Sequence, residues 1–391
     1  MELTPVSQRY HIAFFGCTNA GKSSVVNAVT NQDLSVVSEI KGTTTDPVKK
    51  TMEILPIGAV VIYDTPGFDD ISEIGEKRIE KTNQILLKTD VAVLIVDALS
   101  GMSAKDKELL EIFEKREIPY LIAYNKSDLI EDKKDDLFYI SAKTKENIEL
   151  LKEKISTLAQ TKKTEKFILK DIVNKNDTVI LVIPIDESAP KGRLILPQQN
   201  TLRELLDIGA ISICTQIEEL NGVLSNLKNP PKLVITDSQA FNKVKEIVPE
   251  EINLTSFSIL FARYKGDLKT LIEGANELSQ LKDGDKILIS EGCTHHRQCN
   301  DIGTVKLPNW ISKYTGKKLN FEFTQGGDFP TDLSKYSLIV HCGGCMLNER
   351  EMKSRIETAK ENNIKIVNYG ILIAHINDIL NRATKVFNGK I

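Results

Sequence analysis

The 391-residue sequence contains no stretch of about 18 uncharged apolar residues, so no segment has the length and character of a membrane-spanning helix. Its beginning, MELTPVSQRYHIAFFG, also lacks the basic segment followed by an apolar segment that is typical of a secretory signal. We therefore expect a cytoplasmic protein that does not associate with membranes.

Positive charge is not in surplus either. The 51 Lys and Arg residues are outnumbered by 54 Asp and Glu residues, and the formal net charge is −3. General nucleic-acid binders need an excess of cationic side chains to displace phosphate counterions. We therefore expect no nucleic acid among the partners.

Cysteine is sparse, with six residues in the whole chain, but four of the six fall between positions 293 and 345. So few cysteines in so long a chain do not form the disulfide framework of a small secreted domain. In a reducing compartment, clustered thiols indicate a metal site instead.

Apolar strand-like runs alternate with helical patterns along most of the chain, which predicts an α/β fold built on parallel sheets. The length allows two or three domains. We expect three, at 1–160, 170–265 and 267–391, with the Lys-rich segment 159–176 at the first boundary. The middle domain shows no dense chemistry and is a candidate for subunit association.

Phosphate binding is indicated by GCTNAGKSS, which starts at Gly16 and fits the pattern GxxxxGKS. It follows the apolar run 12–15 and precedes a predicted helix, which is the context that the motif requires. Backbone N–H groups would surround the phosphates, Lys22 would reach the β- and γ-phosphates, and Ser23 would bind Mg²⁺.

Three further motifs select guanine and sense the γ-phosphate. In DTPG, Asp64 would support Mg²⁺ and the N–H of Gly67 would meet the γ-phosphate. In NKSD, Asp128 can accept the N1–H and N2–H of guanine, and such sites reject adenine by about 10⁴-fold. In SAK, the N–H of Ala142 is available to guanine O6.

These four motifs, in this order, resemble the translation-factor-like branch of P-loop GTPases over residues 8–158. The resemblance implies a doubly wound, mostly parallel sheet and a threonine that closes on Mg²⁺, which matches Thr44 in KGTTTDP. The predicted catalytic residues are Lys22, Thr44, Asp64 and Gly67. The predicted GTP, GDP and metal-binding residues are Gly16, Asn19, Ala20, Gly21, Lys22, Ser23, Ser24, Thr44, Asp64, Gly67, Asn125, Lys126, Asp128, Ser141, Ala142 and Lys143.

Two positions refine the expected hydrolysis. Phe68 stands where Ras-like switches carry a glutamine that orients water, which predicts slow intrinsic hydrolysis. Asn19 matches the asparagine that helps to bind K⁺ in GTPases that resemble the tRNA-modification GTPase. This resemblance implies activation by potassium.

The clustered thiols follow two predicted strands. HCGGC, residues 341–345, comes after SLIV, and EGCTHHRQCND comes after KILIS. Ligands in open α/β sheets sit beyond the carboxyl ends of parallel strands. If these two strands are neighbours, Cys293, His295, Cys342 and Cys345 converge, with His341 nearby.

Three occupants suit such a group: tetrahedral zinc, an iron–sulfur cluster with one unusual ligand, or no metal at all, the thiols acting as a redox pair. A domain of more than 100 residues can fold on its own packing, so a metal here would be functional rather than a structural staple.

The pattern CxH followed by HCxxC, behind a GTPase domain and a middle α/β domain, resembles the HydF family, the GTPases of FeFe-hydrogenase maturation. The resemblance covers essentially the whole chain. It implies a 4Fe-4S cluster held by Cys293, Cys342 and Cys345, with one iron left open for a weak or exchangeable ligand. His295 matches one motif histidine and is the candidate for that ligand, and Cys299, outside the family pattern, is another.

The resemblance also implies a homodimer through the middle domain and a scaffold function. A di-iron precursor would be carried on or beside the cluster and delivered to the apo-hydrogenase together with two radical-SAM maturases, while the GTP state regulates partner binding. The alternative function is a ribosome- or tRNA-associated GTPase with a structural zinc site in its C-terminal domain.

Overall fold

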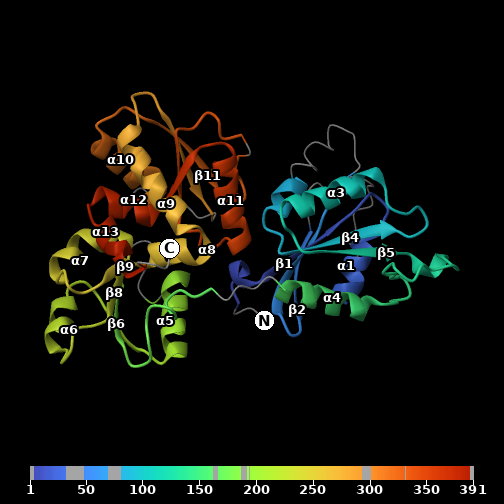
Figure 1. Cartoon of the computed structure of the whole chain (residues 1–391), viewed down its shortest axis with the longest axis horizontal. Helices are drawn as coiled ribbons and strands as arrows, with labels where there is room; N and C mark the ends of the chain where they lie inside the picture. Colours follow the sequence, from blue (N-terminus) through green and yellow to red (C-terminus); the bar gives the residue numbers. More distant parts are fainter. Residues whose placement is uncertain are drawn as a thin grey trace. The chain divides into compact units, whose positions relative to one another are not determined.

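The computed structural model describes residues 4–31, 48–68, 81–161, 166–185, 192, 194–292, 301–330 and 332–387. The chain divides into two compact units, residues 1–164 and 165–391. Each unit is an α/β structure (Figure 1). Among the described residues, no helix combines the length and the apolar character that crossing a membrane requires.

The first unit contains one five-stranded sheet in the order β2-β3-β1-β4-β5. The pairs β3-β1, β1-β4 and β4-β5 are parallel, and β2 pairs antiparallel with β3 at the edge. The strands are β1 (Tyr10–Phe15), β2 (Val48–Ile54), β3 (Gly58–Asp64), β4 (Val91–Asp97) and β5 (Tyr120–Asn125). The helices are α1 (Lys22–Thr30), α3 (Ala104–Lys115) and α4 (Ile148–Thr161).

Both faces of this sheet are buried, as expected for a parallel sheet with helices on either side. Successive strand residues point to opposite faces of the sheet and belong to different apolar clusters, as Phe14 and Phe15 do. One cluster includes α1 and α4, and the other includes α3. The predicted fold class, a P-loop α/β domain followed by further α/β structure, is confirmed.

The second unit contains two four-stranded sheets in which all pairs are parallel. The order of one sheet is β7-β6-β8-β9, with strands β6 (Thr178–Val182), β7 (Ile211–Thr215), β8 (Leu233–Thr236) and β9 (Leu254–Ser256). The order of the other is β11-β10-β12-β13, with strands β10 (Lys286–Glu291), β11 (Asn320–Gln325), β12 (Leu338–His341) and β13 (Lys365–Asn368).

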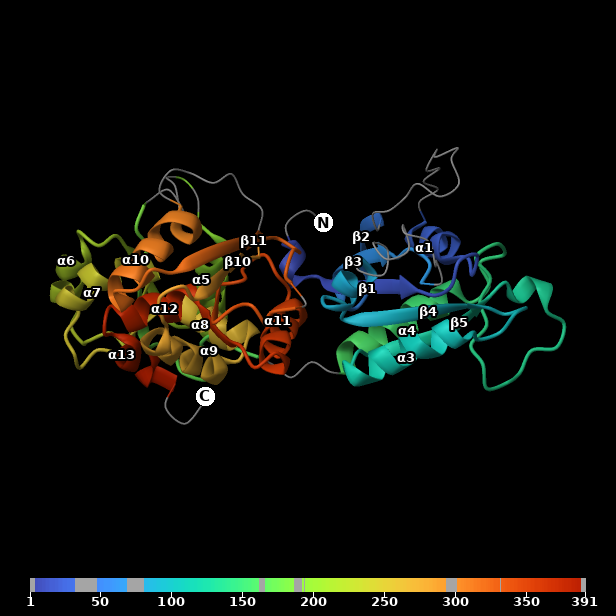
Figure 2. The same ribbon diagram turned by 90° about the horizontal axis from the view of Figure 1, so that it is seen from above.

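One continuous apolar core joins the two sheets of this unit, from Ile168 to Phe387. The helices are α5 (Leu196–Ile208), α6 (Leu220–Asn226), α7 (Phe241–Ile247), α8 (Phe257–Lys265), α9 (Leu268–Ala275), α10 (Leu307–Thr315), α11 (Glu349–Glu361), α12 (Tyr369–Ile376) and α13 (Leu380–Thr384). Helix α12 contacts both α8 and α9, which lie near it in both views (Figures 1 and 2).

A glycine allows one of these close approaches. An added Cβ at Gly274 in α9 would lie 2.0 Å from the carbonyl oxygen of Ile366 in β13. No side chain fits in that space, so the helix packs directly against the strand backbone. The packing places α9 against β13, which is the neighbour of β12 in the sheet.

Candidate functional sites

The phosphate-binding loop joins β1 to the N-terminus of α1. Gly16 has φ +140°, and a Cβ there would lie 2.2 Å from the carbonyl oxygen of Ile95. Gly21, the N-cap residue of α1, has φ +87°. Both positions therefore require glycine. A helix N-terminus such as that of α1 leaves backbone N–H groups without intrahelical partners, and these stabilise an anion.

Lys22, predicted to reach the phosphates, begins α1, and Asp64, predicted to support Mg²⁺, ends β3. The buried Lys22 ammonium donates to the carbonyl oxygens of Gly16 at 3.0 Å and Cys17 at 2.7 Å. Burial raises the pKa of Asp64, while a hydrogen bond from Ser23 and the charge of Lys22 oppose the rise. The Asp64 Oδ1 atom is buried without a hydrogen-bond partner in the described part of the chain, which fits a role in supporting bound Mg²⁺.

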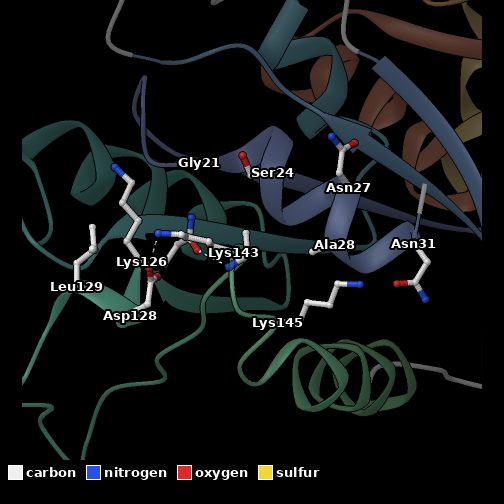
Figure 3. A pocket seen from close by; sticks show the side chains of 12 residues that line it. Gly21, Ser24, Asn27, Ala28, Asn31, Lys126, Asp128, Leu129, Lys143 and Lys145 are labelled. Atoms are coloured by element: carbon white, nitrogen blue, oxygen red, sulfur yellow. Dashed lines mark hydrogen bonds and ion pairs between the residues drawn. The ribbon is translucent and has the colours of Figure 1, made fainter. Parts of the chain in front are cut away.

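A cavity of about 820 Å³ adjoins the loop. Figure 3 shows side chains from α1 on one side of it and the segment that follows β5 on the other. The lining residues are Gly21, Ser24, Asn27, Ala28, Asn31, Asn125, Lys126, Asp128, Leu129, Ala142, Lys143 and Lys145. This volume is in the range of ordinary small-ligand sites.

Asn125 connects three of the predicted motifs. Its side-chain amide donates to the carbonyl oxygen of Ala20 at 3.0 Å and accepts from the N–H of Ala142 at 3.1 Å. The structure thus holds the phosphate loop, NKSD and SAK together. The predicted bond from Ala142 to guanine O6 stays a prediction, because this N–H donates to Asn125 here.

Asp128 lies at the rim of the cavity, where a base carboxylate is expected. The Ser141 hydroxyl donates to its Oδ1 at 2.7 Å, and this bond lowers the Asp128 pKa. Lys143 is 3.9 Å from its Oδ2. The carboxylate is therefore ionised and oriented at neutral pH, as acceptance of two guanine N–H groups requires.

Two supporting pairs in this region were not predicted. The Lys126 ammonium forms an ion pair with Asp97 at the end of β4, and Lys126 itself has φ +69°. The Ser127 hydroxyl donates to Glu146 at 2.6 Å. Neither Asp97 nor Glu146 belongs to a recognisable motif, so no sequence signal identifies them. Thr44 lies outside the described residues.

The thiol motif begins where β10 and β12 end side by side. These strands pair in parallel with Ser290 opposite His341, which meets the condition stated above for convergence of the thiols. The Cys342 N–H extends this pairing by donating to the Ser290 carbonyl oxygen at 2.9 Å. The N–H of Gly292 donates to Cys342 Sγ at 3.0 Å, and that of Gly344 donates at 3.4 Å.

The two described thiols of this loop are in an apolar setting. Burial raises the pKa of Cys342 to about 11, although the two N–H donors oppose the rise. Burial also raises the pKa of Cys345, against the charge of Lys265. Free thiols here are protonated at neutral pH, so a metal would replace their protons.

His341 is held by a buried arginine. Its Nδ1 is 2.8 Å from the Cys342 carbonyl oxygen, and its Nε2 is 3.0 Å from an Arg355 guanidinium nitrogen. Nδ1 therefore carries the proton and donates, and Nε2 accepts. Burial and the Arg355 charge lower the His341 pKa to about 3. Both ring nitrogens are occupied, so His341 supports the loop rather than offering a lone pair to a metal.

A buried lysine from α8 also holds this loop. The Lys265 ammonium donates to the carbonyl oxygens of Gly344 at 3.2 Å, Cys345 at 3.1 Å and Leu347 at 2.8 Å. Lys265 is only 3% exposed, and burial lowers the pKa of its ammonium group to about 8. Sequence reasoning did not identify Lys265, because nothing in ARYKGD indicates a burial of this kind.

Cys293, His295 and Cys299 lie outside the described residues. Among the residues that are described, no group of three or more His, Cys, Asp or Glu side chains could hold a metal ion. Cys342 and Cys345, with N–H groups directed at one sulfur, nevertheless fit a metal–thiolate centre, because such hydrogen bonds are characteristic of metal-bound sulfur. The described part therefore supplies two thiols of the predicted set.

The other two cysteines lie apart from this loop. Cys17 contacts the Ser103 hydroxyl at 3.1 Å. Cys214 is exposed because β7 is an edge strand, although the apolar sequence ISICT is more typical of a central strand.

Family models match almost the whole chain in three segments. Residues 11–126 match a model described as 50S ribosome-binding GTPase, residues 168–266 match the hydrogen maturase F dimerization domain, and residues 269–386 match the hydrogen maturase F tetramerization domain. The chain belongs to the hydrogen maturase F family, HydF. Its first unit carries the GTPase domain of this family, and the two family-specific models fall entirely in its second unit.

Curated GTPases are similar to part of the chain. The chain is 32% identical over 190 residues to a GTPase Der of Kosmotoga olearia, covering 47% of this chain and 41% of that protein. It is 35% identical over 154 residues to a tRNA modification GTPase MnmE of Chromobacterium violaceum, covering 37% and 34%. The chain thus spans less than half the length of these relatives. A crystal structure of a probable GTP-binding protein engB is 25% identical, covers 38% of this chain and 98% of that one, and has a TM-score of 0.29.

Proposed function

We propose that this chain is a GTP-hydrolysing scaffold of FeFe-hydrogenase maturation, which binds a 4Fe-4S cluster and delivers a di-iron precursor to the apo-hydrogenase. The observation that carries the proposal is the combination, in one chain, of a cavity lined by residues of the guanine-nucleotide motifs with a thiol loop inside a region that matches the hydrogen maturase F models. We keep the three-domain division at 1–160, 170–265 and 267–391 as part of this proposal.

In the GTPase reaction, the chain's residues bind and orient the nucleotide. Lys22 would exchange its two carbonyl partners for phosphate oxygens, and Ser23 and Asp64 would hold Mg²⁺. Thr44 and the Gly67 N–H would sense the γ-phosphate. Asn19 has φ +65°, a conformation that asparagine tolerates, and we propose that it contributes to a K⁺ site.

At the thiol loop, we propose that Cys293, Cys342 and Cys345 hold the cluster. Cys293 is the residue after Gly292, whose N–H donates to Cys342 Sγ, and this supports a common site. The cluster would supply an iron with an exchangeable ligand, at which a second iron unit can bind and leave. His295 and Cys299 are the candidates for that ligand, whereas the bonds of His341 support a structural function for it.

The homodimer would form through the middle region, where β7 is an edge strand. Its Ile211 is 53% exposed, and Leu206 on the preceding helix is 59% exposed. A cavity of about 530 Å³ lies beside the strand, lined in part by Ile213, Val223 and Leu227. An exposed apolar edge is typically covered in the assembled protein, and a second copy is the covering that the dimerization-domain match supports.

The functional partners would be the apo-hydrogenase and the two radical-SAM maturases. GTP and GDP regulate these interactions only if the two nucleotide forms bind a partner with different affinity. Membership of the hydrogen maturase F family supports these partners.

Anaerobic reconstitution with iron and sulfide, followed by EPR of the reduced protein, tests the cluster. A cubane signal that is lost in Cys342→Ser and retained in Cys214→Ser supports the proposal, because Cys214 is exposed and belongs to another sheet. Stoichiometric zinc in the purified protein and no signal after reconstitution would instead support the zinc-containing alternative.

A further inference from the structure

Lys265 is the last residue of helix α8, in the segment that matches the dimerization-domain model. The thiol loop that it contacts belongs to the segment that matches the tetramerization-domain model. Its three hydrogen bonds to Gly344, Cys345 and Leu347 thus connect the two segments at the thiols.

These bonds satisfy all three donors of the ammonium group, so the lysine is geometrically fixed. Its charge is a separate matter. In the described part of the chain, no carboxylate forms an ion pair with Lys265, and the groups that favour its charged form are Cys345, Cys342 and Glu349. Glu349 already forms ion pairs with Lys166 at 2.9 Å and Lys353 at 2.8 Å.

A buried charge without a counter-charge is costly, and proteins keep one only where a compensating charge is supplied. Carbonyl dipoles supply part of the compensation here. The remaining anion would come from the two thiols that flank the same loop, once they are deprotonated by a metal. If both thiols were neutral, the Lys265 ammonium would have no opposite charge in its contact with the thiol loop.

We propose that Lys265 is a positioning and charge-compensating residue of the thiol loop, which stabilises an anionic metal–thiolate centre at Cys342 and Cys345 and ties that centre to helix α8. This inference rests on the proposed function, because it assumes a metal centre at the loop. An iron–sulfur centre held by thiolates gains one negative charge with each electron that it takes from a reductant. Lys265 would therefore favour the reduced form and raise the reduction potential of the centre.

The test compares Lys265→Met with wild type after anaerobic reconstitution. Methionine keeps the apolar stem and removes the charge and the three donors. Lys353→Met is the matched control, because Lys353 lies on α11 beside the loop but its side chain is 44% exposed. Iron and sulfide content is measured first, and EPR-monitored titration with dithionite and redox mediators then gives the midpoint potential.

We expect Lys265→Met to lower the ratio of reduced to oxidised centre at a fixed potential at least tenfold, since one unit charge at close range acts strongly in a poorly solvated site. For a one-electron couple this is a midpoint potential lower by about 59 mV. Lys353→Met should stay within about twofold of wild type, because exposed charges are screened. Lys265→Arg, which keeps the charge, should recover most of the potential.

Equal potentials in Lys265→Met and wild type, or equal shifts in Lys265→Met and Lys353→Met, would overturn the inference while leaving the scaffold proposal intact. A wild-type protein that takes up no iron would remove the scaffold proposal itself, and the inference with it. If Lys265→Met does not fold or binds no iron, Lys265→Gln and Lys265→Arg take its place. The midpoint potentials of these two variants must then differ by about 59 mV, which is the same tenfold change in the ratio of reduced to oxidised centre. If they do not, the charge of residue 265 does not stabilise the reduced centre.

Discussion

The nucleotide site and the thiol loop are built at equivalent places, beyond the carboxyl ends of parallel strands, but they are stabilised in opposite ways. Around the nucleotide cavity, charged groups form ion pairs near the surface, such as Lys126 with Asp97. At the thiol loop, the cations Lys265 and Arg355 are 3% and 1% exposed, and the thiols and the imidazole beside them are neutral.

This difference follows from what each site is expected to bind. A nucleotide brings its own phosphate charges and a hydrated metal, so beside the buried ammonium of Lys22 the protein can offer exposed donors and one pre-ionised carboxylate. A metal–thiolate centre is compact and becomes anionic inside the protein. The cationic side chains that balance its charge must therefore already be buried beside the site when the metal binds. The two sites should therefore respond differently when one charged group is removed.

Lys22→Ala should have the largest effect and should be confined to the first unit. Removing the ammonium eliminates the charge that reaches the β- and γ-phosphates, and we expect GTP hydrolysis to fall roughly 10³-fold. Single-turnover hydrolysis measures this loss, and Lys107→Ala, an exposed position on α3, is the control. Iron uptake by the thiol loop should not change. A Lys22→Ala protein that hydrolyses GTP within threefold of wild type would contradict the assignment.

Arg355→Met should have the next largest effect, and it should appear in the second unit. Its guanidinium pairs with Glu351 at 2.7 Å, donates to the Gly326 carbonyl and contacts His341. Without it, a largely buried carboxylate loses its partner, so the free energy of unfolding should fall by about 3 kcal/mol.

The only tryptophan of the chain, Trp310, lies on α10 and reports on that unit by its fluorescence during urea unfolding. Lys353→Met, which removes a half-exposed ion pair, should change the unfolding free energy by less than about 1 kcal/mol. An Arg355→Met transition that coincides with that of Lys353→Met would show that the arginine network adds no stability.

Asp128→Ala should weaken GTP binding rather than folding. The lost carboxylate would otherwise accept two guanine N–H groups, and hydrogen bonds to a charged group contribute about 1.5–3 kcal/mol each relative to an unpaired donor. Because water partly replaces them at this exposed position, we expect the Kd for GTP to rise roughly 50-fold. Fluorescent-nucleotide titration measures it, with Glu131→Ala, an exposed neighbour, as the control. Unchanged discrimination between GTP and ATP in Asp128→Ala would assign base selection to another residue.

The same contrast between the two sites explains which of their features could be predicted from the sequence. The nucleotide motifs are local, so GCTNAGKSS, NKSD and SAK could be located from the sequence alone, and the structure brings Asn125, Ala20 and Ala142 into contact as their order suggests. The antiparallel edge strand β2 was not predicted, because VKKTMEI alternates weakly and carries three charged residues. Charged residues are acceptable in an edge strand, but they weaken the apolar alternation by which a strand is recognised in a sequence.

At the thiol loop, convergence of the thiols required the strands KILIS and SLIV to be neighbours, and the pairing of β10 with β12 meets this condition. The sequence gave no indication of Lys265 or Arg355. Both residues stand in helical segments with ordinary spacing, and only the packing of α8 and α11 against the loop buries them. Charged residues at such positions are usually exposed, so tertiary packing, not composition, identifies them.

The pH dependence of unfolding should distinguish the two units with the smallest effect, because a buried neutral histidine is described in each, His11 in the first and His341 in the second. Burial lowers the pKa of His11 to about 4, against a hydrogen bond to the Val6 carbonyl. Between pH 6.5 and 4, the unfolded first unit therefore binds more protons than the folded one, and its stability falls as the pH falls. At pH 5 the loss should be about 2 kcal/mol relative to pH 7.

His11→Gln should abolish this part of the pH dependence, since glutamine does not titrate and can still donate to Val6. Far-UV circular dichroism follows both units, whereas Trp310 fluorescence follows the second one, in which His341 keeps its own dependence on pH. We therefore expect His11→Gln to lose less stability than wild type between pH 7 and pH 5 in the dichroism transition of the first unit. The fluorescence transition of the second unit should respond to pH as it does in wild type. An equal reduction in both signals would mean that the two units do not unfold independently, and that the contrast between their buried histidines has no separate thermodynamic consequence.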